Sequence, residues 1–144
     1  MEDLDSAVVL GMSDQAPDGI VIIDREGLIR YWNRGAERIF GFAAADVAGR
    51  SLDVIIPERH RKRHQEGFDA AMERGSSKYG QADLLSVPAL AADGRKLSIE
   101  FSVVLLSGPD GSPYCGAVIR DVTARRERER ELMRRRAEAA QASV

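Results

Sequence analysis

The chain has 144 residues, with 21 Lys and Arg against 23 Asp and Glu, a formal net charge of -2 and one cysteine. This length fits a single domain with one core. The near-neutral charge gives no overall attraction to nucleic acid or to an acidic membrane, and one cysteine excludes an intrachain disulfide framework. The acidic start and the lack of a long apolar run predict a cytoplasmic protein without a secretory signal or membrane span.

The first half of the chain predicts a helix, a β-hairpin and several helical segments. Leu4, Val8 and Met12 share one face of an amphipathic helix near the start. Asn33 is placed to cap a short helix that Gly41 ends, because its side chain can accept from the first free amides. The other elements expected here are strands at 20–23 and 28–32, helical segments at 43–47 and 52–56, and a longer helix at 58–74.

The second half of the chain predicts three strands in consecutive hairpins, followed by a helix. The strands are expected at 79–89, 96–106 and 114–122, and an exposed helix rich in Arg and Glu follows from Thr123. Consecutive hairpins give antiparallel neighbours, and the helices between the two groups of strands must cover one face of the sheet. The pattern therefore predicts an α+β domain with a pocket between sheet and helices.

The only two histidines, His60 and His64, lie four residues apart in the predicted helix 58–74. His64 joins an apolar stripe with Phe68 and Met72, whereas His60 lies one turn nearer the exposed end. Imidazole is the commonest protein ligand for a metal, although basic helical turns are also typical of a solvated surface. A paired zinc site would need a third ligand, and none follows from the spacing.

The sequence offers no catalytic constellation. No serine or cysteine stands beside a histidine in a nucleophile motif, and no glycine-rich phosphate loop follows a predicted strand. The carboxylates fall mainly in turns and in the charged C-terminal segment. We therefore expect a protein that is not an enzyme.

Several short motifs, in their order and spacing, resemble the PAS family of sensor domains between Gln15 and Thr123. They are Ala16-Pro17-Asp18-Gly19-Ile20, Ile23-Asp24-Arg25-Glu26-Gly27, Tyr31-Trp32-Asn33 with Ala36, Phe40-Gly41-Phe42, Val47-Ala48-Gly49, Ile56-Pro57-Glu58, Asp93-Gly94 and Ile119-Arg120-Asp121-Val122-Thr123. The resemblance implies a PAS fold, in which a five-stranded antiparallel sheet carries short helices and one longer helix on one face. The expected organisation is an N-terminal flanking helix at 1–14, the PAS domain at 15–123 and a charged helix at 124–144.

The resemblance also implies how such a domain signals. PAS domains are usually dimeric, and we expect a homodimer formed by the N-terminal helix together with the uncovered face of the sheet. The run Asp121-Val122-Thr123 resembles the family's junction between the last strand and the output helix. There, Asp121 is expected to cap the helix or to pair with Arg125 or Arg126.

Two PAS subfamilies can be compared through single residues. Flavin photoreceptors need a reactive cysteine after the asparagine that starts the helix facing the flavin, but Asn33 is followed by Arg34 and Gly35. No flavin photochemistry is therefore expected. The helix 58–74 resembles the haem-binding helix of the rhizobial oxygen-sensor histidine kinases, and His64 falls where those proteins place the proximal iron ligand. The resemblance thus implies haem b bound through His64.

The expected cofactor-binding residues are His64 and Phe68 on the helix, with Leu84, Leu85, Phe101 and Val103 on the facing strands. The oxygen-sensing kinases use a distal arginine to hold O₂, whereas this chain has leucine there. O₂, CO, NO and redox state therefore all stay open as the signal.

Three functions are compatible with these features. The first is a PAS signalling domain that binds haem through His64 and senses a diatomic gas or redox state. The second is a cofactor-free PAS module for dimerisation or for binding a small metabolite. The third is a stand-alone haem redox protein.

Overall fold

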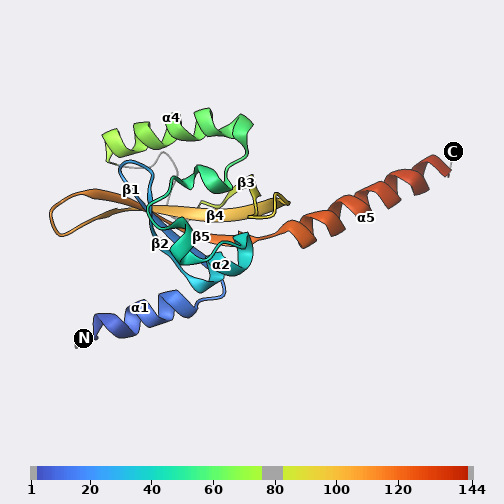
Figure 1. The fold of residues 1–144 in the computed structure, drawn as a ribbon. Coiled ribbons are helices and arrows are strands. Elements are labelled where there is room, and N and C mark those ends of the chain that lie inside the picture. Colours follow the sequence, from blue (N-terminus) through green and yellow to red (C-terminus); the bar gives the residue numbers. More distant parts are fainter. Residues whose placement is uncertain (1–2, 76–82, 143–144) are drawn as a thin grey trace.

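The computed structural model describes residues 3–75 and 83–142. They form an α+β fold in which α4 lies over one face of a five-stranded sheet, α1 contacts α2, and α5 projects away from the sheet (Figure 1). The elements in chain order are α1 (Ser6–Gln15), β1 (Gly19–Asp24), β2 (Ile29–Trp32), α2 (Arg34–Phe40), α3 (Ala44–Val47), the 3₁₀ helix η1 (Leu52–Ile55), α4 (Glu58–Arg74), β3 (Leu85–Leu90), β4 (Lys96–Ser107), β5 (Pro113–Asp121) and α5 (Thr123–Ala142).

The sheet has the strand order β2-β1-β5-β4-β3, and every neighbouring pair is antiparallel. The hairpins β1–β2, β3–β4 and β4–β5 join strands that are adjacent in sequence. The pairing of β1 with β5 instead brings the two ends of the domain together at the centre of the sheet. The predicted five-stranded antiparallel sheet of an α+β domain is thereby confirmed.

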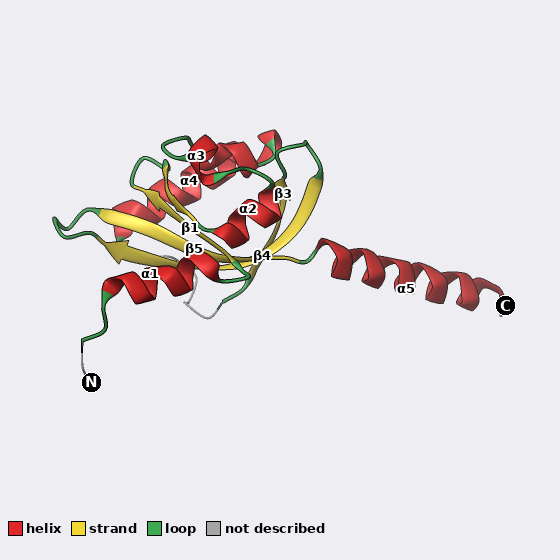
Figure 2. Ribbon diagram, turned by 60° about the horizontal axis from the view of Figure 1, so that its bottom comes forward, coloured by secondary structure: helices red, strands yellow, loops and turns green. Residues whose placement is uncertain are grey.

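The core lies on one face of the sheet because apolar side chains alternate along the strands. Val21 and Ile23 on β1 and Leu97 and Ile99 on β4 are buried there. Helices α2, α3 and α4 cover this face (Figure 2). Their buried side chains are Ala36, Phe40, Val47, Phe68 and Met72. Burying each large apolar side chain contributes about 1.5–3 kcal/mol, so this layer contributes most of the stability.

The β1–β2 turn depends on a buried carboxylate. Asp24 Oδ1 accepts hydrogen bonds from the amides of Glu26 and Leu28, and Arg30 Nε lies 2.7 Å from Asp24 Oδ2. Burial raises the pKa of Asp24, but the hydrogen bonds from Leu28, Arg30 and Glu26 outweigh it and hold the pKa below its ordinary value. The charged carboxylate therefore fixes the hairpin that begins the sheet.

Most predicted elements agree with the structure to within one residue at each end, and two differ by more. The first helix begins at Ser6 rather than Leu4, because the side chain of Asp5 caps it by accepting from the amide of Ala7. The third strand begins at Leu85, where pairing with β4 starts, and it extends to Leu90. Of the strand expected at 79–89, residues 79–82 lie outside the described residues.

Candidate functional site

The helix α4 turns one of its two histidines toward the interior. Pro57 precedes the helix, and its fixed φ suits this position. His64 is half-buried and stacks on Phe68, with ring centroids 6.2 Å apart and an interplanar angle of 9°. Phe68 and Met72, which follow along the same face, are buried in the core. His64 thus extends the apolar stripe of α4 toward its N-terminal half.

The surroundings of His64 favour a neutral imidazole. Burial lowers the pKa of His64 below its ordinary value of 6.5, and the nearby carboxylate of Asp53 only partly opposes this. The Nδ1 atom of His64 is buried and has no hydrogen-bond partner among the described residues. A neutral ring with an unpartnered nitrogen is the form of histidine that binds metals.

The second histidine has different surroundings. His60 is half-buried, one turn before His64, and its Nε2 accepts from Arg59 Nε at 3.1 Å. Within residues 3–75 and 83–142, no three His, Cys, Asp or Glu side chains come together as a metal-binding group. The structure therefore places the two histidines in separate environments.

The sheet residues expected around His64 fall into two groups. Leu85 pairs with Phe101, and Val103 follows two residues later, so all three lie on the face that the helices cover. Phe101 packs against the buried core. Leu84 precedes β3 and is 67% exposed, so it lies outside the packed interior. The fold thus brings three of the four predicted sheet residues to the face that the helices cover, and their role in binding a cofactor stays a prediction.

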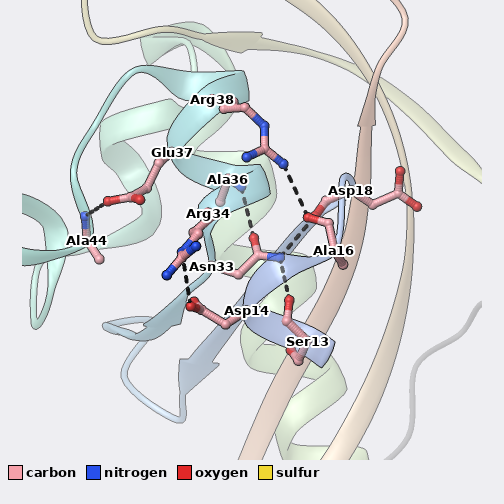
Figure 3. Close-up of polar contacts among 10 residues, drawn as sticks. All are labelled: Ser13, Asp14, Ala16, Asp18, Asn33, Arg34, Ala36, Glu37, Arg38 and Ala44. Carbon is pink, nitrogen blue, oxygen red and sulfur yellow. Dashed lines mark hydrogen bonds and ion pairs between the residues drawn. The ribbon is translucent and has the colours of Figure 1, made fainter. Parts of the chain in front are cut away.

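A second cluster of polar contacts, between α1 and α2, joins the N-terminal helix to the domain (Figure 3). Asn33 is fully buried, and its Oδ1 accepts from the amides of Ala36, at 2.9 Å, and Ile20, at 2.8 Å. Its Nδ2 donates to the carbonyls of Ser13, at 2.8 Å, and Asp18, at 3.0 Å. The predicted helix cap is confirmed, but the same side chain also holds the end of α1.

Other residues of α2 strengthen this junction. Arg34 Nε lies 3.4 Å from Asp14 Oδ2, and Arg38 Nη2 donates to the carbonyl of Ala16. Gly35 is buried directly against the backbone of Asp18, which leaves no space for a side chain. The sequence shows each of these residues but not their convergence, because the partners are 15 to 22 positions apart.

A third group of contacts fixes the start of α5. The amide of Ser98 donates to Thr123 Oγ1, and the carbonyl of Ser98 accepts from the amide of Val122. Asp121 Oδ1 accepts from the amide and hydroxyl of Thr123, as expected for a cap. Arg125 pairs with Glu100 on β4 and not with Asp121, because Glu100 lies on the strand beside the first turn of α5.

Known proteins similar to this chain identify the family to which its architecture belongs. The family described as PAS fold matches residues 13–127. The chain is 25% identical over 119 residues to Sensor protein FixL of Bradyrhizobium diazoefficiens, covering 81% of this chain and 23% of that protein. It is 28% identical over 119 residues to Oxygen sensor protein DosP of Escherichia coli, covering 80% of this chain and 14% of that protein. The chain thus spans less than a quarter of the length of either relative.

A solved structure of a PAS domain has the same fold as this chain. The crystal structure of the PAS domain of a protein from Colwellia psychrerythraea has a TM-score of 0.70 and 21% sequence identity, covering 83% of this chain and 98% of that chain. This likeness concerns the fold. Among the described residues, no helix is both long enough and apolar enough to cross a membrane. The match of the family over residues 13–127 shows that the chain belongs to the PAS-fold family and is a sensory PAS domain like those in sensor proteins.

Proposed function

We propose that this PAS domain binds haem b through His64 and senses a diatomic gas or redox state. The observation that carries the proposal is the buried, unpartnered Nδ1 of a half-buried imidazole on the face of α4 that packs toward the sheet. The likeness to FixL and DosP supports it, because FixL is a sensor protein and DosP an oxygen sensor protein.

The residues around His64 are chemically compatible with haem. His64 would supply the axial nitrogen, and the lowered pKa of its ring keeps that nitrogen free of a competing proton near neutral pH. Phe68, stacked on His64, orients the ring. Leu85, Phe101 and Val103 would provide apolar walls that exclude water, whereas Leu84 would have to move inward to take part. Bound haem would supply an iron centre that can take a gas ligand or change its oxidation state.

Reconstitution with haemin tests the proposal directly. The protein is expected to show a Soret band after free haemin is removed, and His64→Ala should abolish it. Added imidazole should restore the band in the His64→Ala protein, because it replaces the missing axial nitrogen. His60→Ala is the matched control and should retain the wild-type spectrum, since His60 contacts Arg59 and lies in a separate environment.

Absence of a Soret band in the wild-type protein would contradict haem binding. A band that is lost in His60→Ala but kept in His64→Ala would contradict the ligand assignment. Two observations favour the cofactor-free alternative. Phe68 and Met72 already pack into the core, and the groove of about 510 Å³ beside the N-terminal end of α4 is not lined by His64. Under that alternative, a metabolite would bind without iron.

We also propose that the domain forms a homodimer through α1. Val8 and Leu10 are each 57% exposed and Met12 is 80% exposed, although all three are apolar. On the uncovered sheet face, Val118 and Leu106 add further exposed apolar surface. Apolar surface of this kind on a small domain is typical of an interaction site.

Sedimentation equilibrium tests this second proposal. The wild-type chain is expected to be dimeric at micromolar concentration, and Val8→Glu combined with Met12→Glu should make it monomeric, because two charges would enter the interface. Leu132→Glu is the control, since Leu132 is exposed on α5 and lies outside the proposed surface. A wild-type protein that stays monomeric, or a double variant that stays dimeric, would contradict this interface.

A further inference from the structure

The helix α5 is attached to the domain almost entirely by polar contacts. None of its described residues is buried, so apolar packing does not set its direction. Its first turn is tied to β4 by the bonds between Thr123 and Ser98 and by the ion pair between Arg125 and Glu100. The Glu100 side chain is only 15% exposed, on the sheet face opposite the core. The charge of Glu100 therefore attracts the first turn of α5 through Arg125.

This ion pair belongs to a row of alternating charges across the uncovered face of the sheet. Within α5, the Nε atom of Arg125 also lies 3.6 Å from Glu129 Oε1. Arg120 on β5 is the cross-strand neighbour of Glu100. The Nε atom of Arg120 lies 3.4 Å from Asp18 Oδ2, at the start of β1. Opposite charges on directly opposed strand residues attract. The four side chains Asp18, Arg120, Glu100 and Arg125 thus alternate in sign. The first two and the last two form ion pairs, and the cross-strand neighbours Arg120 and Glu100 join the two pairs through the attraction of opposite charges.

The other end of the row lies at the junction that holds α1. The carbonyl of Asp18 accepts from Asn33 Nδ2, and the same amide group donates to Ser13 in α1. Gly35 packs directly against the Asp18 backbone. A shift of α1 or α2 must therefore move Asp18, and with it the carboxylate that faces Arg120.

We propose that this charge row is an electrostatic strap that couples the attachment of α1 to the orientation of α5. Ion pairs at a protein surface are individually weak and are screened by salt, so removing one charge of the row is expected to weaken the attachment of α5 without unfolding the domain. The row contains none of the residues proposed to hold haem. The strap gives the two flanking helices a connection across the open face, independent of the cofactor.

Amide hydrogen exchange in the first turn of α5 tests the strap. The amide of Arg126, bonded to the carbonyl of Val122, reports on this turn. Asp18→Asn removes a charge that does not itself contact α5. It is expected to speed exchange at residues 123–128 by about twofold to fivefold at low ionic strength. The effect should vanish in about 1 M NaCl, where the Debye length is about 3 Å.

Three further variants make the result decisive. Arg120→Gln should reproduce the effect of Asp18→Asn, and the double variant should show no further increase, because both changes break the same row. Arg135→Gln is the matched control, since Arg135 pairs with Glu131 within α5 at 3.1 Å and lies outside the row. The proposal is overturned if Asp18→Asn leaves exchange at 123–128 unchanged, if the two effects add fully, or if high salt leaves them intact.

Discussion

Replacing Gly35 by alanine is expected to destabilise the domain by about 3 kcal/mol or more. A Cβ atom at this position would lie 2.1 Å from the carbonyl oxygen and 2.5 Å from the carbonyl carbon of Asp18. Both are backbone atoms, so no side-chain rotation can relieve the overlap. The start of β1 or helix α2 must move, and either movement breaks the hydrogen bonds around Asn33. Urea denaturation followed by circular dichroism measures the loss.

Gly67→Ala is the matched control for this change. Gly67 also lies within a helix, but a Cβ atom there meets nothing within 4 Å. Alanine is favoured over glycine in helices, so Gly67→Ala is expected to raise the free energy of unfolding by about 0.5–1 kcal/mol. If both variants gave the same stability change, the close approach of Gly35 to Asp18 would not be the cause.

Local signals in the sequence predicted most of the fold. The helix expected at 58–74 has these same limits in the structure, because Pro57 and Gly75 mark its ends by their backbone preferences. Along β4, apolar residues alternate with polar ones in the sequence, and the apolar Leu97 and Ile99 are buried. Strand limits were less predictable, since β3 begins only where β4 offers it a partner.

The site could be predicted less completely, because it depends on contacts between distant segments. The helical spacing of His64 and Phe68 was enough to predict that they share a face. The position of Leu84 depends instead on where β3 starts, and the partner of Arg125 depends on which strand lies beside α5. The junction around Asn33 brings together backbone groups up to 20 residues away, and a backbone carbonyl leaves no signal in the sequence.

Removing the amide of Asn33 is the second change expected to have a large effect. Asn33→Ala should lower the free energy of unfolding by about 3 kcal/mol, because a helix cap is worth about 1 kcal/mol and the amide of Ile20, left without its acceptor, costs a further ~1–3 kcal/mol. The carbonyls of Ser13 and Asp18 also lose a donor, although Ser13 still accepts from the amide of Ala16. Chemical denaturation gives the overall loss, and hydrogen exchange shows whether α1 is released.

The variant Asn33→Asp separates the two halves of this side chain. It keeps an oxygen that can accept from Ile20 and Ala36, but it replaces the donating nitrogen by an oxygen that faces the carbonyls of Ser13 and Asp18. Their repulsion raises the pKa of the introduced carboxyl in the folded state. Below that pKa the protonated group can donate, so this variant should be least stable at neutral pH and recover as the pH falls.

Arg38→Ala is the control for these changes. It removes only an exposed 3.4 Å contact to Ala16 and should stay within about 0.5 kcal/mol of wild type. A loss in Asn33→Asp that does not change with pH would show that the donor to α1 contributes nothing beyond the cap.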